Sequence, residues 1–138
     1  MSDELMFVYG TLRKDTASPM KPVLDQYCEL LGTASMRGKL YDLGRYPGLV
    51  INEEGAGPVS GQLFRLKDVQ KVLREFDYYE ECSDDFPEPH LYVREKVQVI
   101  KADGRAHMAW VYIYNRPTAG HIHIQGGDYI EYLAQKSG

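Results

Sequence analysis

The sequence has few of the features that mark secreted, membrane-spanning or nucleic-acid-binding proteins. Its two cysteines, Cys28 and Cys82, lack metal-ligand spacing, so we expect free thiols in a reducing cytoplasm rather than a disulfide framework. No stretch approaches the roughly 18 apolar residues of a membrane span, and the acidic beginning, MSDEL, is unlike a basic signal peptide. No run of Lys or Arg occurs and the net charge is −4, which disfavours nucleic acid as a partner.

What the sequence has instead is the composition of an ordinary globular domain. Of its 138 residues, 43% are hydrophobic and 26% are charged, and a chain of this length forms one domain with a substantial core. We therefore expect a single cytoplasmic domain over residues 1–138. Its eleven tyrosines combine buried area with a polar tip, which suits pocket walls and interfaces.

Hydrophobic periodicity and turn signals predict the order β-α-β-β-β-α-β-β-α. Strands are expected at residues 5–9, 33–41, 49–51, 59–66, 91–100 and 107–114. Helices are expected from Ser18 or Pro22 to Leu31 with Gly32 as the stop, over residues 67–80, and from a cap at Asp128. This order is not a regular β-α-β alternation. It favours an α+β fold, a small mixed, largely antiparallel β-barrel flanked by helices.

The helix predicted over residues 67–80 directs one of several neighbouring carboxylates inward. Its apolar stripe contains Leu73 and Phe76, and the next position on that stripe is Glu80. A carboxylate in apolar surroundings has a raised pKa, which suits acid–base chemistry near neutral pH. If the helix ends one residue early, Glu80 turns outward, and periodicity leaves both outcomes open. The other acids of this stretch are expected at the surface: Glu75, Asp77, Glu81 and Asp84.

The first predicted strand ends at Tyr9 and is followed by Gly10. Glycine permits backbone angles that other residues avoid and lets a ligand approach the main chain closely. Consecutive backbone N–H groups in such a turn can bind an anion, for example a substrate carboxylate. A strand followed by a glycine turn is common, so this feature is informative only together with others.

An ordered set of motifs resembles the gamma-glutamylcyclotransferase-like family, in particular its small gamma-glutamylamine cyclotransferase branch. VYGTLR at residues 8–13 is similar to the family's YG(S/T)L loop. The motifs that follow, in the family's order, are GKLYDLGRYPGLV at 38–50, VSGQLFRL at 59–66, FDYYE at 76–80, YVR at 92–94 and WVYIY at 110–114. The family fold that this resemblance implies is a small mixed β-barrel with flanking helices, in agreement with the predicted element order.

The resemblance also implies an activity and a site. The implied reaction closes the γ-glutamyl part of a small-molecule amine or peptide into 5-oxoproline and releases the free amine, an acyl-transfer or lyase-type cyclisation without metal or organic cofactor. The family motif assigns the general acid/base to Glu80, the residue that helical phase also selects. The implied substrate-binding residues are Tyr9, Gly10, Thr11, Leu12, Tyr92 and Tyr114. The oligomeric state is not indicated.

Other interpretations remain open. The same fold could bind a glutamyl-like acid without turnover, or its tyrosines could form an interface with a partner. His121 and His123 invite a metal site, but no third ligand of matching spacing is evident. Cys82 has no histidine placed to activate it as a nucleophile. The acids of the connection over residues 81–91 predict a cationic or neutral leaving group in preference to an anionic one.

Overall fold

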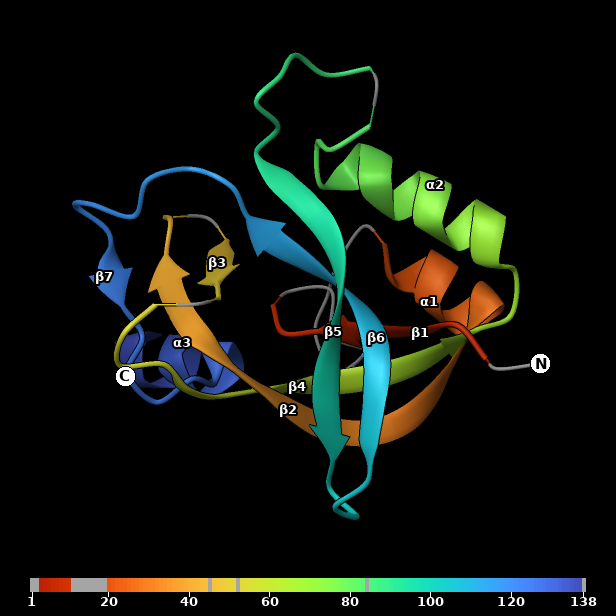
Figure 1. Cartoon of the computed structure of the whole chain (residues 1–138), viewed down its shortest axis with the longest axis horizontal. Coiled ribbons are helices and arrows are strands. Elements are labelled where there is room, and N and C mark those ends of the chain that lie inside the picture. Colours follow the sequence, from red (N-terminus) through yellow and green to blue (C-terminus); the bar gives the residue numbers. More distant parts are fainter. Residues whose placement is uncertain (1–2, 11–19, 45, 52, 84, 138) are drawn as a thin grey trace.

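The computed structural model describes residues 3–10, 20–44, 46–51, 53–83 and 85–137. The order of its elements is β1 (Leu5–Val8), α1 (Lys21–Tyr27), β2 (Cys28–Asp42), β3 (Pro47–Val50), β4 (Gly57–Leu66), α2 (Val69–Tyr79), β5 (Tyr92–Lys101), β6 (Ala106–Tyr114), β7 (Ile122–His123) and α3 (Tyr129–Ser137) (Figure 1). The predicted order is confirmed, with the short β7 as an addition. The loop predicted after Gly10 lies outside the described residues.

Five of the strands close into a barrel. Neighbouring strands pair in the order β2-β4-β1-β6-β5, and a further pairing of β2 with β5 completes the ring. The pairing of β1 with β6 is parallel, and the other four are antiparallel. The prediction of a small mixed, largely antiparallel barrel is therefore confirmed. Outside the ring, β3 and β7 each pair with the C-terminal part of β2.

Two hydrophobic clusters explain why β1 is apolar on both faces. Leu5 and Phe7 belong to a cluster inside the barrel, formed by side chains of all five ring strands. Met6 and Val8 alternate with them and belong to a second cluster, where α1 and α2 cover the outside of the barrel (Figure 1). Burial of each such side chain contributes about 1.5–3 kcal/mol. Both faces of β1 therefore hold it in place, and its end, from which the site is built, is fixed.

Helix α1 is shorter than the sequence predicts. Pro22 lies in its first turn, where the missing N–H has no helical partner to lose, and the helix ends at Tyr27 rather than Leu31. The following residues pair with β4 instead, so strand pairing overrides the helical spacing. Gly32 does not stop the helix. It lies in β2 with a φ of 132°, next to a shift in the register between β2 and β4.

Helix α3 is capped as predicted and is tied to the end of β2. The Asp128 carboxylate accepts a hydrogen bond from the backbone N–H of Ile130 (3.0 Å). Asp42, a buried residue, accepts hydrogen bonds from the Tyr132 hydroxyl (2.7 Å) and the Lys136 ammonium (3.1 Å). Figure 1 shows that α3 lies apart from α1 and α2, so the helices flank different parts of the barrel.

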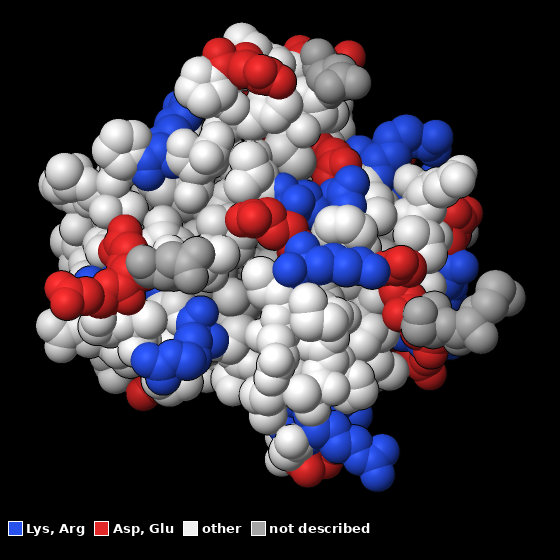
Figure 2. Space-filling view, in the orientation of Figure 1, with Lys and Arg blue, Asp and Glu red and all other residues white. Residues whose placement is uncertain are grey.

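The surface carries both signs of charge. On the face shown in Figure 2, basic and acidic side chains are interspersed. Among the residues that the structure describes, no helix is long and apolar enough to cross a membrane.

Candidate active site

Glu80 stands directly after the last residue of α2. The helix ends at Tyr79, and Glu80 is its C-cap, with its backbone N–H donating to the Phe76 carbonyl (2.8 Å). This bond keeps Glu80 in helical phase with Phe76, which is fully buried between α2 and the barrel. The side chain of Glu80 therefore faces a pocket beside the barrel, whereas Glu81 is exposed, as predicted.

The chain reverses immediately after Glu80 in a Schellman motif. The N–H of Glu81 donates to the Tyr78 carbonyl (3.2 Å) and the N–H of Cys82 donates to the Asp77 carbonyl (2.9 Å). Glu81 has a φ of 56°, in the left-handed region that favours glycine, at a cost of about 1–2 kcal/mol. This position therefore carries a carboxylate beside Glu80 where helices more often have glycine.

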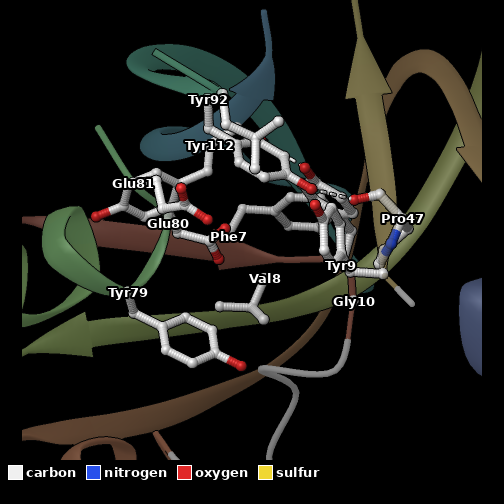
Figure 3. A pocket seen from close by; sticks show the side chains of 12 residues that line it. Phe7, Val8, Tyr9, Gly10, Pro47, Tyr79, Glu80, Glu81, Tyr92 and Tyr112 are labelled. Atoms are coloured by element: carbon white, nitrogen blue, oxygen red, sulfur yellow. Dashed lines mark hydrogen bonds between the residues drawn. The ribbon is translucent and has the colours of Figure 1, made fainter. Parts of the chain in front are cut away.

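The Glu80 side chain forms one wall of a pocket of about 190 Å³. The pocket lies among the end of β1, the start of β3, the end of α2, and β5 and β6 (Figure 3). Its lining is largely apolar and aromatic with a few polar groups, which is typical of small-molecule sites. The lining residues are Phe7, Val8, Tyr9, Gly10, Tyr46, Pro47, Tyr79, Glu80, Glu81, Leu91, Tyr92 and Tyr112.

The pocket changes the acidity of Glu80. The pKa of Glu80 is raised to about 8, mainly because burial removes water from the charged carboxylate and secondly because the charge of Glu81 lies nearby. A carboxyl group with this pKa exists in both protonation states around neutral pH. It can therefore accept a proton and return one within a single reaction cycle.

Two buried tyrosines are fixed beside Glu80. The Tyr9 hydroxyl donates to the Tyr112 carbonyl (2.6 Å), and the Tyr92 hydroxyl donates to the Pro47 carbonyl (2.6 Å; Figure 3). Burial raises the pKa of both phenols, and the charge of Glu80 contributes to both shifts. Both hydroxyls are therefore neutral at physiological pH. Since each already donates its proton to a carbonyl, its oxygen is left to accept a hydrogen bond from a ligand.

Gly10 brings the end of β1 close to the start of β3. A Cβ atom added to Gly10 would lie 2.7 Å from Cγ of Pro47, closer than side chains pack. The glycine is therefore needed for close approach of the backbone to Pro47, and this contact forms part of the pocket wall.

Of the residues that the sequence assigns to the site, the structure brings four to the pocket: Tyr9, Gly10, Glu80 and Tyr92. Thr11 and Leu12 lie outside the described residues. Tyr114 does not line the pocket. Its ring packs edge-on against the ring of Tyr92, with 5.8 Å between the centroids, so it supports a pocket residue from behind.

Sequence reasoning missed several pocket residues and misplaced one acid. The lining residues that were not assigned to the site are Phe7, Val8, Tyr46, Pro47, Tyr79, Glu81, Leu91 and Tyr112. Tyr46 and Pro47 belong to the quoted GKLYDLGRYPGLV motif, which was a possible signal for them. The prediction that Asp77 lies at the surface is wrong, because its carboxylate is half-buried in an ion pair with Arg94 of β5 (2.8 Å). Asp84 lies outside the described residues.

The thiols and imidazoles do not join this site. Cys28 and Cys82 are free, and burial raises the pKa of Cys82 to about 12, so its thiolate is scarce at neutral pH. The ring of His123 packs on Tyr41, whereas the ring of His121 packs on Tyr114. Within the described part of the chain, no group of three His, Cys, Asp or Glu side chains could hold a metal ion.

The raised pKa of Glu80 predicts that the fold loses stability as the pH rises. Below the ordinary glutamate value of 4.5, both the folded and the unfolded chain hold the proton. Between 4.5 and about 8 the unfolded chain releases it while the folded chain keeps it, so the free energy of unfolding falls with rising pH. Glu80→Gln removes this effect.

Between pH 5 and pH 8.5, we expect the free energy of unfolding of the parent to fall by about 2–4 kcal/mol more than that of Glu80→Gln. Urea unfolding of both proteins at the two pH values measures this difference. The control is the exposed residue Glu88, for which the Gln variant should follow the parent at both pH values. An equal change in the free energy of unfolding of the parent and of Glu80→Gln between the two pH values would contradict the expectation.

These features define a small barrel protein in which a helix end places a carboxyl group with a raised pKa in a tyrosine-lined pocket. The sequence model of the family described as "Gamma-glutamyl cyclotransferase, AIG2-like" matches residues 6–131. The chain belongs to this family.

Known proteins with similar sequences carry the name of this family. The chain is 32% identical over 127 residues to the "Gamma-glutamylcyclotransferase family protein YtfP" of Escherichia coli, covering 91% of this chain and 96% of that protein. It is 32% identical over 129 residues to a "Putative gamma-glutamylcyclotransferase" of Vibrio cholerae, covering 92% and 96%.

Solved structures show the same fold. The structure resembles that of ytfP from Escherichia coli with a TM-score of 0.62 and 30% identity, covering 94% of this chain and 98% of that one. It resembles an AIG2-like protein from Mus musculus with a TM-score of 0.62 and 19% identity, covering 94% and 96%.

Proposed function

We propose that this protein converts the γ-glutamyl part of a small-molecule γ-glutamyl amine or peptide into 5-oxoproline and releases the free amine. Glu80 acts as the general acid and base. The observation that carries the proposal is the Glu80 carboxyl group, whose pKa of about 8 fits proton transfer, in a pocket of small-molecule size. The family and the names of the relatives support this class of reaction.

The proposed reaction is intramolecular, and Glu80 moves its protons. The substrate's α-ammonium is a weaker acid than a peptide N-terminus, whose pKa is about 8, because its α-carboxylate is free. The pKa of Glu80 at about 8 brings the two groups far closer than an ordinary glutamate would, so the free-energy cost of proton transfer between them is small. The free amine then attacks the γ-carbonyl carbon and closes the five-membered ring. When the bond to the leaving nitrogen breaks, Glu80 returns the proton to that nitrogen. The ring nitrogen, which carries two hydrogens after the attack, gives up one of them to the departing amine, so the products are 5-oxoproline and an ammonium.

The remaining pocket groups orient the substrate. Tyr9 and Tyr92 present phenol oxygens whose protons are already donated to carbonyls, and these oxygens can accept hydrogen bonds from the substrate ammonium. By the family motif, the backbone N–H groups from Gly10 to Leu12 hold the α-carboxylate and the oxyanion of the tetrahedral intermediate. The edge-on contact of the Tyr114 ring with the Tyr92 ring keeps the Tyr92 phenol in place.

The direct test offers a panel of γ-glutamyl amines and γ-glutamyl peptides and detects free 5-oxoproline by mass spectrometry. Release of 5-oxoproline together with one equivalent of amine is the expected result. Binding of these compounds without release, seen by calorimetry across the panel, would favour a binding protein of the same fold.

The carboxylate of Glu81 predicts which leaving amine is preferred. Glu81 lines the pocket and is exposed, so it attracts a cationic leaving group and repels an anionic one by about 1 kcal/mol at short range. We therefore expect kcat/KM for a γ-glutamyl diamine to exceed that for a γ-glutamyl amino acid about fivefold or more.

The Glu81→Gln variant should reduce this preference to near unity, because the amide carries no charge. Glu88→Gln is the matched control: Glu88 is an exposed acid of the same connection and does not line the pocket, so the parent's preference should persist. A parent that prefers the γ-glutamyl amino acid would refute the role assigned to Glu81.

A further inference from the structure

Asp77 precedes Glu80 along the chain and is hydrogen-bonded to Cys82, which follows it. It lies three residues before Glu80, in the last turn of α2, and its carbonyl accepts the N–H of Cys82 (2.9 Å), two residues after Glu80. The Asp77 carboxylate accepts a second, longer contact from the Cys82 thiol (3.7 Å). Residues 77–82, which are the last turn of α2 and the reversal after it, therefore form a loop whose two ends are joined by the bond between Asp77 and Cys82.

The Asp77 carboxylate also fastens this loop to the barrel. Arg94 of β5 donates from Nε to Oδ1 (2.8 Å) and from Nη2 to Oδ2 (3.1 Å), and the hydroxyl of Tyr112 of β6 donates to Oδ1 (2.8 Å). Charge-assisted bonds of this two-pronged kind are the strong ones and fix direction as well as distance. The Asp77–Arg94 pair is half-buried, so water screens it less than a surface pair.

Among the described residues, the other side-chain contacts that the structure shows at the end of α2 are packing contacts, including the ring of Tyr78 on that of Phe86 (5.3 Å between the centroids). Phe76 packs into the cluster beneath the helix, but Tyr78 is 59% exposed and Tyr79 is 39% exposed. Helix ends fray unless their last turn is anchored. Asp77 is therefore the polar anchor of the turn that presents Glu80.

Tyr112 connects the hydrogen bonds of Asp77 to the substrate pocket. Tyr112 lines the pocket, and its ring stacks on Phe76, with 6.4 Å between the centroids. Its carbonyl accepts the hydroxyl of Tyr9 (2.6 Å), while its own hydroxyl donates to Asp77. One residue thus connects the anchor of α2 to a pocket phenol.

We propose that Asp77 and Arg94 are positioning residues, which hold the loop of residues 77–82 against the barrel so that the Glu80 carboxyl group stays in the pocket. This inference rests on the proposed function in one respect, the role of Glu80 as acid and base. Neither Asp77 nor Arg94 lines the pocket, so both act through the backbone and not on the substrate.

Release of the loop changes the surroundings of Glu80 in a predictable direction. The ionisable groups near its carboxyl group are Tyr9 directly after β1, Tyr92 from β5, and its neighbours Glu81 and Cys82. The phenols and the thiol are neutral at pH 7, because burial raises their pKa values, and the charge of Glu81 raises the pKa of Glu80. If the loop moves outward, Glu80 gains water, and its pKa falls toward the ordinary value.

The test removes the Asp77–Arg94 pair without changing the net charge. In Asp77→Ala/Arg94→Met the methionine keeps an apolar stem over Trp110, where the guanidinium now lies 4.3 Å from the ring centroid. The matched control is Glu4→Ala/Lys96→Met. It removes a neighbouring pair (2.9 Å) whose lysine lies over the same Trp110 ring but does not contact the loop.

The pKa of Glu80 is measured by carbon-13 NMR of its side-chain carboxyl group, assigned by the signal that Glu80→Gln lacks. We expect the Asp77/Arg94 double variant to lower this pKa by about one unit or more and to lower kcat about tenfold with little change in KM. The Glu4/Lys96 double variant should match the parent in the pKa and in kcat. An unchanged Glu80 pKa in a folded Asp77/Arg94 variant would overturn the proposal.

A second variant covers loss of folding. Arg94→Lys keeps the charge but loses the two-pronged contact, so the pKa should fall in the same direction by a smaller amount, and an unchanged value would contradict the positioning role. The NMR titration needs no turnover. If no protein releases 5-oxoproline, the proposed function fails, while the pKa values still decide whether Asp77 and Arg94 position Glu80.

Discussion

Glu80→Gln is expected to lower the rate of 5-oxoproline release by about 10³-fold, within the range that general acid–base catalysis supplies. The amide has nearly the size of the carboxyl group and fits the same pocket wall, but it cannot take a proton from the substrate ammonium or return one to the leaving amine. Because Glu80 is mostly protonated in the free pocket at pH 7, substrate affinity depends little on its charge. The loss should therefore appear in kcat, with KM changed less than about threefold.

Glu81→Gln is the control for this result, since it removes a carboxylate at the next position without touching the proposed acid and base. It should keep kcat within about tenfold of the parent, because burial, the larger cause of the raised pKa of Glu80, remains when the charge of Glu81 is removed. Purified proteins assayed over the same range of substrate concentrations give both constants. A Glu80→Gln protein that turns over as fast as the parent would remove Glu80 from the mechanism.

Gly61→Ala is expected to destabilise the fold by about 3 kcal/mol, at the upper end of the range for overpacked cores. A Cβ atom at Gly61 would collide with the carbonyl oxygen of Val8 and would lie 2.6 Å from Cζ of Phe7. Gly61 lies on β4, the strand that pairs directly with β1, next to the partner of Val8, and Phe7 belongs to the interior cluster. Neither the backbone carbonyl nor the fully buried ring can move without opening the barrel, so the strain cannot relax locally.

Gly57→Ala is the matched control on the same strand. A Cβ atom at Gly57 meets no atom within 4 Å, so the change should leave the free energy of unfolding within about 0.5 kcal/mol or raise it slightly. Thermal and urea unfolding of both variants measure the difference. Equal stability of Gly61→Ala and Gly57→Ala would contradict the packing described for the barrel interior.

The candidate site was predictable from the sequence to the extent that it depends on local periodicity. Side chains four positions apart on a helix share a face, and this rule separates Glu80 from Glu81 without knowledge of the rest of the chain. That β1 is a strand buried on both faces follows from the same kind of local pattern, an unbroken run of apolar residues whose side chains point alternately to the two faces. The family resemblance then supplied Tyr9, Gly10 and Tyr92, which the pocket brings together with Glu80.

Contacts between elements were not predictable in this way. Asp77 occupies a polar position on α2, and only the packing of the helix against β5 and β6 places it within reach of Arg94 and Tyr112. Tyr114 was assigned to the pocket with Tyr92, but the cross-strand pairing of these residues puts its ring behind that of Tyr92. In α1, pairing with β4 decided where the helix ends.

The sequence by itself therefore determined the class of fold, the order of the elements and the carboxylate that points inward, because each depends on neighbouring residues along the chain. The tertiary structure alone decided what surrounds that carboxylate. Tyr9 and Tyr112 are 103 residues apart, and Tyr92 and Pro47 are 45 apart, yet hydrogen bonds join them in one pocket wall. Such pairings follow from strand register and barrel closure, and these arise only when the whole chain packs together.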